Sequence, residues 1–287
     1  MKKINYVMFR SMIINTLLVI VKVLVGVIGH SSVLIADGIH SLSDLSTDVI
    51  AIFGNVFANK PADENHPFGH GKIEYLTSIV VGIIIFCLGL KLVLSAFTQK
   101  FIIPNNIVFI TAIFTIIMKN LLANYILKKG REYKNSILIA SGKESKTDVY
   151  SSFVVLVAFI GSKLTDINYI FSYSDAIGTA IVGSFIIFTS FNVLKENVTS
   201  ILGQREYNEE LVNKIKNIIK VDNKVKSIDD ITIIKYGSYY SLNLDISFDS
   251  SLNLKEANDI SERAKKELLK KIKELSYIKI SIKPYME

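Results

Sequence analysis

The sequence predicts an α-helical membrane protein with six transmembrane helices and a C-terminal cytosolic α+β domain that is ferredoxin-like in its order of elements. Three observations lead to this fold class. Half of the 287 residues are apolar and the mean hydropathy is +0.38, which is more apolar than an ordinary soluble domain. The apolar residues form runs of about 20, the length that crosses a bilayer. These runs end near residue 205 and the rest is rich in Lys, Glu and Asp, so we expect a membrane domain over 1–205 and a cytosolic domain over 206–287.

The apolar runs define the expected spans. They cover roughly 8–29, 32–57, 75–98, 104–127, 137–163 and 172–197. The fifth is interrupted by Lys143, Glu144, Lys146 and Asp148. An even number of spans puts both termini on one side, and the helix ends on that side carry most of the basic residues: Lys2, Lys3, Arg10, Lys60, Lys72, Lys128, Lys129, Arg131 and Lys134. The opposite ends carry only Lys100 and Lys163. Since Lys and Arg prefer cytosolic loops, we expect both termini in the cytosol and the protein in the cell (inner) membrane.

The sequence of the tail predicts helices and strands in the order α-β-β-α-β. Its elements are a helix over 207–219, strands near 229–236 and 240–248, a helix over 254–273 and a strand over 277–282. The second strand is the clearest, because Leu242, Leu244, Ile246 and Phe248 alternate with polar residues. Gly237 and Ser238 indicate the turn between the first two strands. Such a small α+β layer packs around one core.

Composition narrows the function classes. The single cysteine, Cys87, excludes an intrachain disulfide and argues against redox chemistry as the function. The net charge of +7 is explained by positive cytosolic loops better than by nucleic-acid binding. No cleavage pattern of a signal peptide stands out, so we expect the first apolar segment to be retained.

The second span carries a polar stripe on an otherwise apolar helix. Asp37, His40, Asp44 and Asp48 are spaced by 3, 4 and 4 residues and so share one helix face. Ionisable groups at membrane depth cost roughly 2.5 to 3.5 kcal/mol each and usually face the bundle interior or a water-filled path. The alternative is a structural polar seam between helices. Asp37 and Asp48, taken singly, could also cap, bond a neighbour or line the entry pathway.

The fifth span supplies a second pair, Glu144 and Asp148, again four residues apart. Together with His40 and Asp44 they can make one four-ligand site between two helices. One imidazole and three carboxylates suit a divalent transition metal. The alternative for this pair is a set of intrahelical ion pairs.

The loop after the second span holds Asp63, His66 and His70 within eight residues. A carboxylate with two imidazoles makes a candidate for a second metal site on the cytosolic face. The alternative is loop architecture, with the imidazoles bonding the backbone.

At these residues the chain resembles the cation diffusion facilitator family of divalent metal transporters. The resemblance runs from Lys22 and Gly26 through SSVLIADGIHSLSD, then through the loop PADENHPFGHGKIE, Lys119 in IIMKNLL and Asp148 in KTDVYSS. It implies that His40, Asp44, Glu144 and Asp148 are the transport ligands and that Asp63, His66 and His70 are the loop ligands. It also implies a homodimer, metal–proton exchange and export from the cytosol.

The chain departs from the family pattern in its ligand types. Zinc-type members commonly have His or Asp where this chain has Glu144, which weakens a zinc assignment. The tail has no histidine, and Ser281 and Lys283 stand where tail ligands are expected. Asp229 and Asp245 remain as weak tail candidates. We therefore expect the tail to provide dimer contacts, with regulation open, rather than a tight metal cluster.

The expected activity is efflux of zinc, iron(II) or manganese(II), with zinc first only because it is frequent in the family. Repulsion among the carboxylates favours proton uptake by the empty site, and metal binding expels those protons. Alternating access would then give metal–proton antiport, with the metal as substrate and no cofactor. Two alternatives remain open. One is a non-transporting membrane metal sensor or scaffold. The other is a membrane di-metal carboxylate enzyme, which would need Glu-x-x-His spacing and more acids.

Overall fold

The computed structural model describes residues 2–58, 63–66, 68–98, 101–133, 135–219, 224–237 and 239–285. The chain divides into two compact units. The first comprises residues 1–49 and 80–194, and the second comprises residues 50–79 and 195–287. The second unit therefore joins the connection that follows the second helix to the C-terminal tail.

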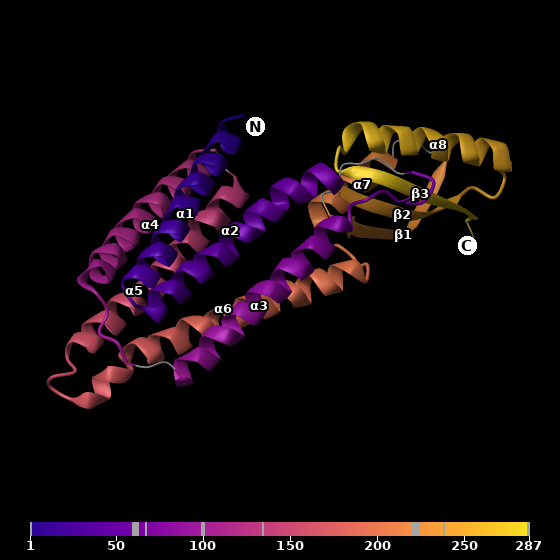
Figure 1. Cartoon of the computed structure of the whole chain (residues 1–287). Helices are drawn as coiled ribbons and strands as arrows, with labels where there is room; N and C mark the ends of the chain where they lie inside the picture. Colours follow the sequence, from indigo (N-terminus) through magenta and orange to yellow (C-terminus); the bar gives the residue numbers. More distant parts are fainter. Residues whose placement is uncertain are drawn as a thin grey trace. The chain divides into compact units, whose positions relative to one another are not determined.

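Six long helices fall on the six expected spans (Figure 1). They are α1 (Lys2–Ile28), α2 (Ser32–Ala58), α3 (Ile73–Thr98), α4 (Asn106–Glu132), α5 (Ser136–Lys163) and α6 (Ser174–Ile201), with a short 3₁₀ helix, η1 (Tyr169–Tyr173), before α6. The helices α1 and α4 extend beyond their apolar runs by six and five residues, into Lys- and Arg-bearing turns. An apolar run marks the part of a helix that lipid can cover, whereas the hydrogen-bonded helix continues through polar residues.

Four helices of the described chain are long and apolar enough to cross a membrane. They are Tyr6–Ile28, Ile73–Thr98, Asn106–Glu132 and Tyr169–Ile201. The helices α2 and α5 are outside this group, and both carry ionisable residues in mid-helix. The structure thus establishes four strongly apolar helices, and the full set of six spans stays a prediction.

The outer surfaces of these helices are apolar. Leu24 on α1, Ile84 on α3 and Phe188 on α6 expose 56%, 54% and 64% of their surface. Soluble monomers rarely expose contiguous apolar surface of this kind. A bilayer covers such surface, and the helical backbone satisfies its own hydrogen bonds there. The exposed apolar residues therefore indicate lipid-facing sides.

Small and branched apolar residues form the core of the helical unit. Val33 and Ala36 of α2 pack with Val108 of α4, Val155 of α5 and Val182 of α6, all fully buried. Gly38 on α2 allows a close approach to α1, since a Cβ there would lie 2.7 Å from a methyl group of Val23 and 3.3 Å from Cβ of Lys22. This approach brings Lys22 beside the polar stripe of α2.

Side-chain caps start several helices. Asn105, Asn135 and Asn253 each accept a hydrogen bond from a backbone N–H in the first turn of the following helix. At the start of α2, the buried carboxylate of Asp175 on α6 accepts bonds from the hydroxyl of Ser31 at 2.8 Å and the backbone N–H of Ser32 at 2.9 Å. A carboxylate at this end also complements the helix dipole, so the first turn of α2 is held in register with α6.

The tail forms a three-stranded sheet with two helices. Its elements are α7 (Glu209–Ile219), β1 (Val225–Tyr236), β2 (Tyr239–Phe248), α8 (Leu254–Lys271) and β3 (Leu275–Pro284). The sheet order is β1-β2-β3, with β1 antiparallel and β3 parallel to β2. A parallel pair requires a crossover, which α8 supplies. The predicted order α-β-β-α-β is confirmed.

Alternating residues of the sheet and one face of each helix build the tail core. The predicted apolar face of β2 is confirmed, because Leu242, Leu244, Ile246 and Phe248 are at most 2% exposed. On α7, Leu211, Ile215 and Ile219 are buried against the same cluster, and Ile218 is partly buried there. The 3.6-residue and 2-residue periods of the sequence therefore describe this domain well.

The first tail strand is longer than predicted. It begins at Val225 rather than near residue 229. Register irregularities lie between Val225 and Ser227 and between Ile228 and Asp230. A bulge breaks the alternation of faces, so the early part of β1 shows no readable strand pattern in the sequence.

Candidate metal centre

Three of the four predicted transport ligands come together. Single ligand atoms of His40, Asp44 and Asp148 lie within 4.8 Å of one another. His40 and Asp44 are one turn apart on α2, and Asp148 faces them from α5, with its Oδ1 4.0 Å from Nε2 of His40. Donor atoms around one ion, each bound at about 2.1 Å, are themselves about 3 to 4.2 Å apart. The cluster is therefore close to the geometry that a single divalent ion needs.

The cluster is shielded from solvent. His40 and Asp148 are buried, and Asp44 is partly buried. The Nδ1 atom of His40 is buried with no hydrogen-bond partner among the described residues. Two carboxylates and one imidazole in such a place attract a cation strongly.

Glu144 lies outside this three-residue group. It occupies α5 one turn before Asp148, and its side chain is exposed. Its carboxylate nevertheless interacts electrostatically with that of Asp44. The structure thus places Glu144 at the edge of the cluster, where it remains a predicted fourth ligand.

Lys119 is part of the cluster although the ligand pattern did not single it out. Its ammonium group reaches from α4 to Oδ2 of Asp148 at 2.5 Å, and Lys119 is 1% exposed. The sequence signal was an isolated lysine within an apolar run. A buried lysine is costly unless it is paired, but the pattern does not say which carboxylate pairs with it.

Asp37 belongs to a separate buried network. Lys22 of α1 lies 2.8 Å from Oδ2 of Asp37 and donates to the hydroxyls of Ser41 and Ser152 at 3.0 Å. Ser151 and Ser152 of α5 donate to Asp37 at 2.5 and 2.8 Å. Asp37 therefore bonds its neighbours and links α1, α2 and α5. Asp48 lies on α2, but its side chain is outside the described residues.

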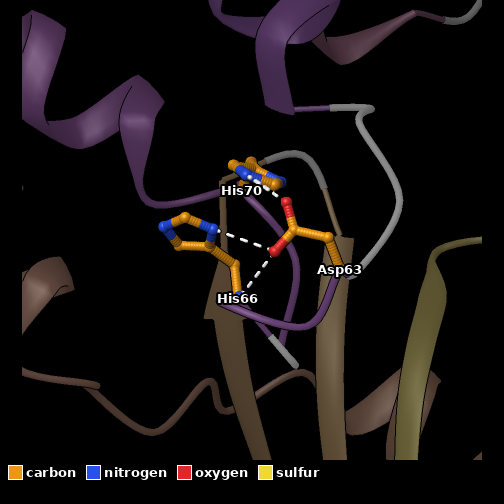
Figure 2. A group of neighbouring side chains, drawn as sticks. All are labelled: Asp63, His66 and His70. Atoms are coloured by element: carbon orange, nitrogen blue, oxygen red, sulfur yellow. Dashed lines mark hydrogen bonds and ion pairs between the residues drawn. The ribbon is translucent and has the colours of Figure 1, made fainter.

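The loop residues Asp63, His66 and His70 gather as predicted (Figure 2). Oδ1 of Asp63 lies 3.0 Å from Nδ1 of His66, and Oδ2 lies 3.4 Å from Nε2 of His70. The backbone N–H of His66 also donates to Asp63 at 2.6 Å. This bond, with the His66 imidazole, holds the pKa of Asp63 below its ordinary value. One ligand atom of each residue lies within 4.8 Å of the others, so the loop geometry fits a second metal site as well as a hydrogen-bonded turn.

The loop is docked on the turn of the tail hairpin within the second unit. The ring of Phe68 packs edge-on against Tyr277 of β3, with 5.0 Å between centroids. The hydroxyl of Tyr239 donates to the backbone oxygen of Phe68 at 2.8 Å. Gly237, with φ 61°, lets the hairpin approach Gly71 so closely that a Cβ on Gly71 would collide with the backbone oxygen of Tyr236.

The two tail candidates have other partners. Asp229 accepts hydrogen bonds from Ser227 and Ser247 at 2.5 Å, which lowers its pKa from the ordinary value. Asp245 pairs with Lys283 at 2.6 Å. Within the described part of the tail, no three ligand-type side chains gather as they do in the loop and on α2 and α5. Asp229 and Asp245 thus lie on paired strands without forming such a group.

Comparisons with known proteins cover both halves of the chain. A sequence model described as the cation efflux transmembrane domain matches residues 8–202, and one described as the cytoplasmic domain of cation efflux proteins matches residues 207–285. The manganese efflux system protein MneP of Bacillus subtilis (strain 168) is 32% identical over 288 residues, which cover 96% of this chain and 95% of that protein.

Two further relatives extend the comparison. An uncharacterized transporter of Methanocaldococcus jannaschii is 32% identical over 276 residues, covering 93% of this chain and 94% of that protein. The magnetosome protein MamB of Magnetospira sp. (strain QH-2) is 24% identical over 268 residues, covering 92% and 89%. The similarity therefore spans the helices and the tail together.

Proposed function

This chain belongs to the cation efflux (cation diffusion facilitator) family of membrane metal transporters, and from that premise we propose that it exports manganese(II) in exchange for protons. Both family domains match in order and cover most of the chain. The resemblance seen in the sequence is thereby confirmed, and the chain is a transporter rather than an enzyme. The choice of metal, the proton coupling and the topology are the proposal.

The donor set of the cluster carries the choice of metal. His40, Asp44 and Asp148 offer two carboxylates and one imidazole, and Glu144 adds a third carboxylate at the edge. Oxygen donors favour manganese(II), whereas imidazole-rich sets favour zinc. The name of the relative MneP, a manganese efflux system protein, points the same way. Manganese(II) therefore ranks ahead of iron(II) and zinc, which reverses the order that family frequency alone suggests.

Proton exchange follows from the same groups. The ligands must be deprotonated to bind metal, so binding releases protons and an empty site regains them. If the cluster is open alternately to the two sides of the membrane, metal leaves as protons enter. Six spans put both termini on one side of the membrane, and the match of the tail to a cytoplasmic domain supports the cytosolic side. The name of that domain model, which refers to a dimer, supports a homodimer.

Reconstituted vesicles test the function. The full chain should take up manganese(II) into vesicles and dissipate a pH gradient while doing so. Asp44→Ala and Asp148→Ala should each reduce uptake at least about 10-fold, because even the loss of a group that only supports a metal ligand typically costs 10- to 100-fold in affinity or activity. Asp166→Ala, an exposed carboxylate outside the cluster, is the matched control and should transport normally.

The outcomes separate the alternatives. No uptake of manganese, iron(II), zinc, cobalt or cadmium by the intact chain would refute transport and favour the sensor or scaffold. Uptake without any change in the pH gradient would refute antiport only. Preference for zinc over manganese(II) would refute the metal assignment while leaving the transport function intact.

A further inference from the structure

The carboxylate of Asp148 divides its two oxygens between different partners. Its Oδ1 faces Nε2 of His40 at 4.0 Å, whereas its Oδ2 is held by the ammonium of Lys119 at 2.5 Å. Lys119 comes from α4, which packs alongside α5, and is 1% exposed. A metal ion entering between His40, Asp44 and Asp148 therefore meets a carboxylate whose far oxygen already binds a cation.

The charges of the proposed site do not balance without Lys119. Bound metal ligands are deprotonated, so Asp44, Asp148 and Glu144 contribute three negative charges and a divalent ion returns two positive charges. These four groups alone would leave the loaded site with one net negative charge, next to the buried His40 and Asp148, and a net charge in such a place is costly. Lys22, the other buried lysine near α2, cannot supply the difference because it is paired with Asp37 at 2.8 Å. Among the described residues, Lys119 lies within hydrogen-bonding distance of one proposed ligand, 2.5 Å from Oδ2 of Asp148.

We propose that Lys119 is a positioning residue that balances the third carboxylate of the metal site and restricts Asp148 to one metal-binding oxygen. The inference rests on the proposed function, and specifically on Glu144 joining the site. Without the lysine, the site attracts a divalent ion more strongly and releases it more slowly. With it, the loaded site is neutral, and an ion bound there can leave again.

The test compares single and paired charge removal in the full chain. Lys119→Met should lower the manganese(II) Kd at least about tenfold and slow maximal uptake. The reason is that the ammonium group lies 2.5 Å from a ligand carboxylate, and a unit charge so close to the bound ion acts strongly in a protein interior. Glu144→Gln should raise the Kd by a similar factor. Lys119→Met combined with Glu144→Gln should bring both the Kd and the uptake rate back to within about threefold of the unaltered chain, because the charges balance again.

The direction of the Kd change separates charge balance from structural support. If Lys119 merely held α4 against α5, Lys119→Met would raise the Kd and the double variant would bind more weakly still, which would overturn the inference. Lys119→Arg keeps the charge and should bind and transport like the unaltered chain. Lys146→Met with Glu144→Gln is the matched control, since Lys146 is an exposed lysine on α5, and it should keep the weak binding of Glu144→Gln.

A binding measurement and a fallback variant make the experiment decisive. Calorimetry on the purified full chain gives the Kd of manganese(II) even if no uptake occurs, so failure of the transport proposal and failure of this inference are distinguishable. If Lys119→Met alone does not fold, the double variant decides. A Kd near that of the unaltered chain supports the inference, and a Kd equal to or weaker than that of Glu144→Gln overturns it.

Discussion

Glu144 is the residue at which the choice of metal can be tested most directly. It sits one turn before Asp148 on α5 and interacts electrostatically with Asp44. Glu144→His adds an imidazole and removes a negative charge, so the ratio of zinc to manganese(II) uptake should rise at least about tenfold. Vesicle uptake with each metal measures this ratio. An unchanged ratio would show that Glu144 does not contact the ion, and Glu132→His, at the exposed end of α4, controls for the added imidazole.

Asp37 gives a second residue-scale prediction, for stability rather than transport selectivity. Asp37→Asn leaves the buried ammonium of Lys22 uncompensated, and breaking such a pair costs about 3 to 5 kcal/mol. We expect a lower thermal unfolding temperature of the purified chain. Lys22→Met combined with Asp37→Leu should recover much of the loss, since replacing both members of a buried pair by apolar groups is often near neutral. A full loss of metal binding with unchanged stability would instead make Asp37 a ligand.

The sequence predicted which ionisable side chains would gather on α2 and α5 better than it predicted their partners. The i, i+4 spacing placed His40 and Asp44 on one face of α2, and the structure brings Asp148 to them. Spacing within a helix says nothing about which neighbouring helix faces it. For that reason the pairs Lys119–Asp148 and Lys22–Asp37, which join residues 29 and 15 positions apart, became visible only in the fold.

At the scale of elements, the loop of Asp63, His66 and His70 depends on the tail hairpin. Phe68 packs against Tyr277 with 5.0 Å between ring centroids and against Tyr236 with 6.4 Å, and such pairs contribute about 0.5 to 1.5 kcal/mol each. Phe68→Ala should therefore speed backbone hydrogen exchange across residues 63–72 severalfold while leaving α4 and α5 unchanged. Mass spectrometry of the full chain measures this exchange.

The control for this loop prediction is Phe97→Ala on α3, a phenylalanine that is 81% exposed. It should not alter exchange in the loop. Equal protection in Phe68→Ala and the unaltered chain would mean that the polar contacts of the loop, such as the hydrogen bond from Tyr239 to the backbone oxygen of Phe68, hold it without the ring.

The bounds of a helix or strand could be predicted where its apolar residues recur regularly, and could not where the strand is irregular. The alternation in β2 and the apolar face of α7 gave those elements within two residues. The strand β1 carries register irregularities near Ile228, so its first residues have no alternating pattern to read. The docking of the loop on the hairpin was also unpredictable, because it depends on the close approach of Gly71 and Gly237, residues 166 positions apart.

For the whole molecule, the number of spans determines on which side each connection lies. In the described part of the chain four helices are strongly apolar, whereas α2 and α5 carry the ionisable groups of the candidate metal site. Such helices can still span a membrane when their polar faces point into the bundle. His40 and Asp148 are buried, so these two residues meet that condition. We therefore expect α2 and α5 to span.

Cysteine labelling distinguishes the possible topologies. Two variants of a Cys87→Ser chain each carry one new cysteine. Glu132→Cys lies at the end of α4 and Asp166→Cys lies after α5, and both positions are exposed. With six spans, a membrane-impermeant maleimide applied to intact cells should label Asp166→Cys, and it should label Glu132→Cys only after the cells are permeabilised. If neither α2 nor α5 spans, both cysteines react in intact cells. If α5 alone does not span, neither cysteine reacts in intact cells. In that topology the tail lies outside the cell, where it could not act as a cytosolic domain.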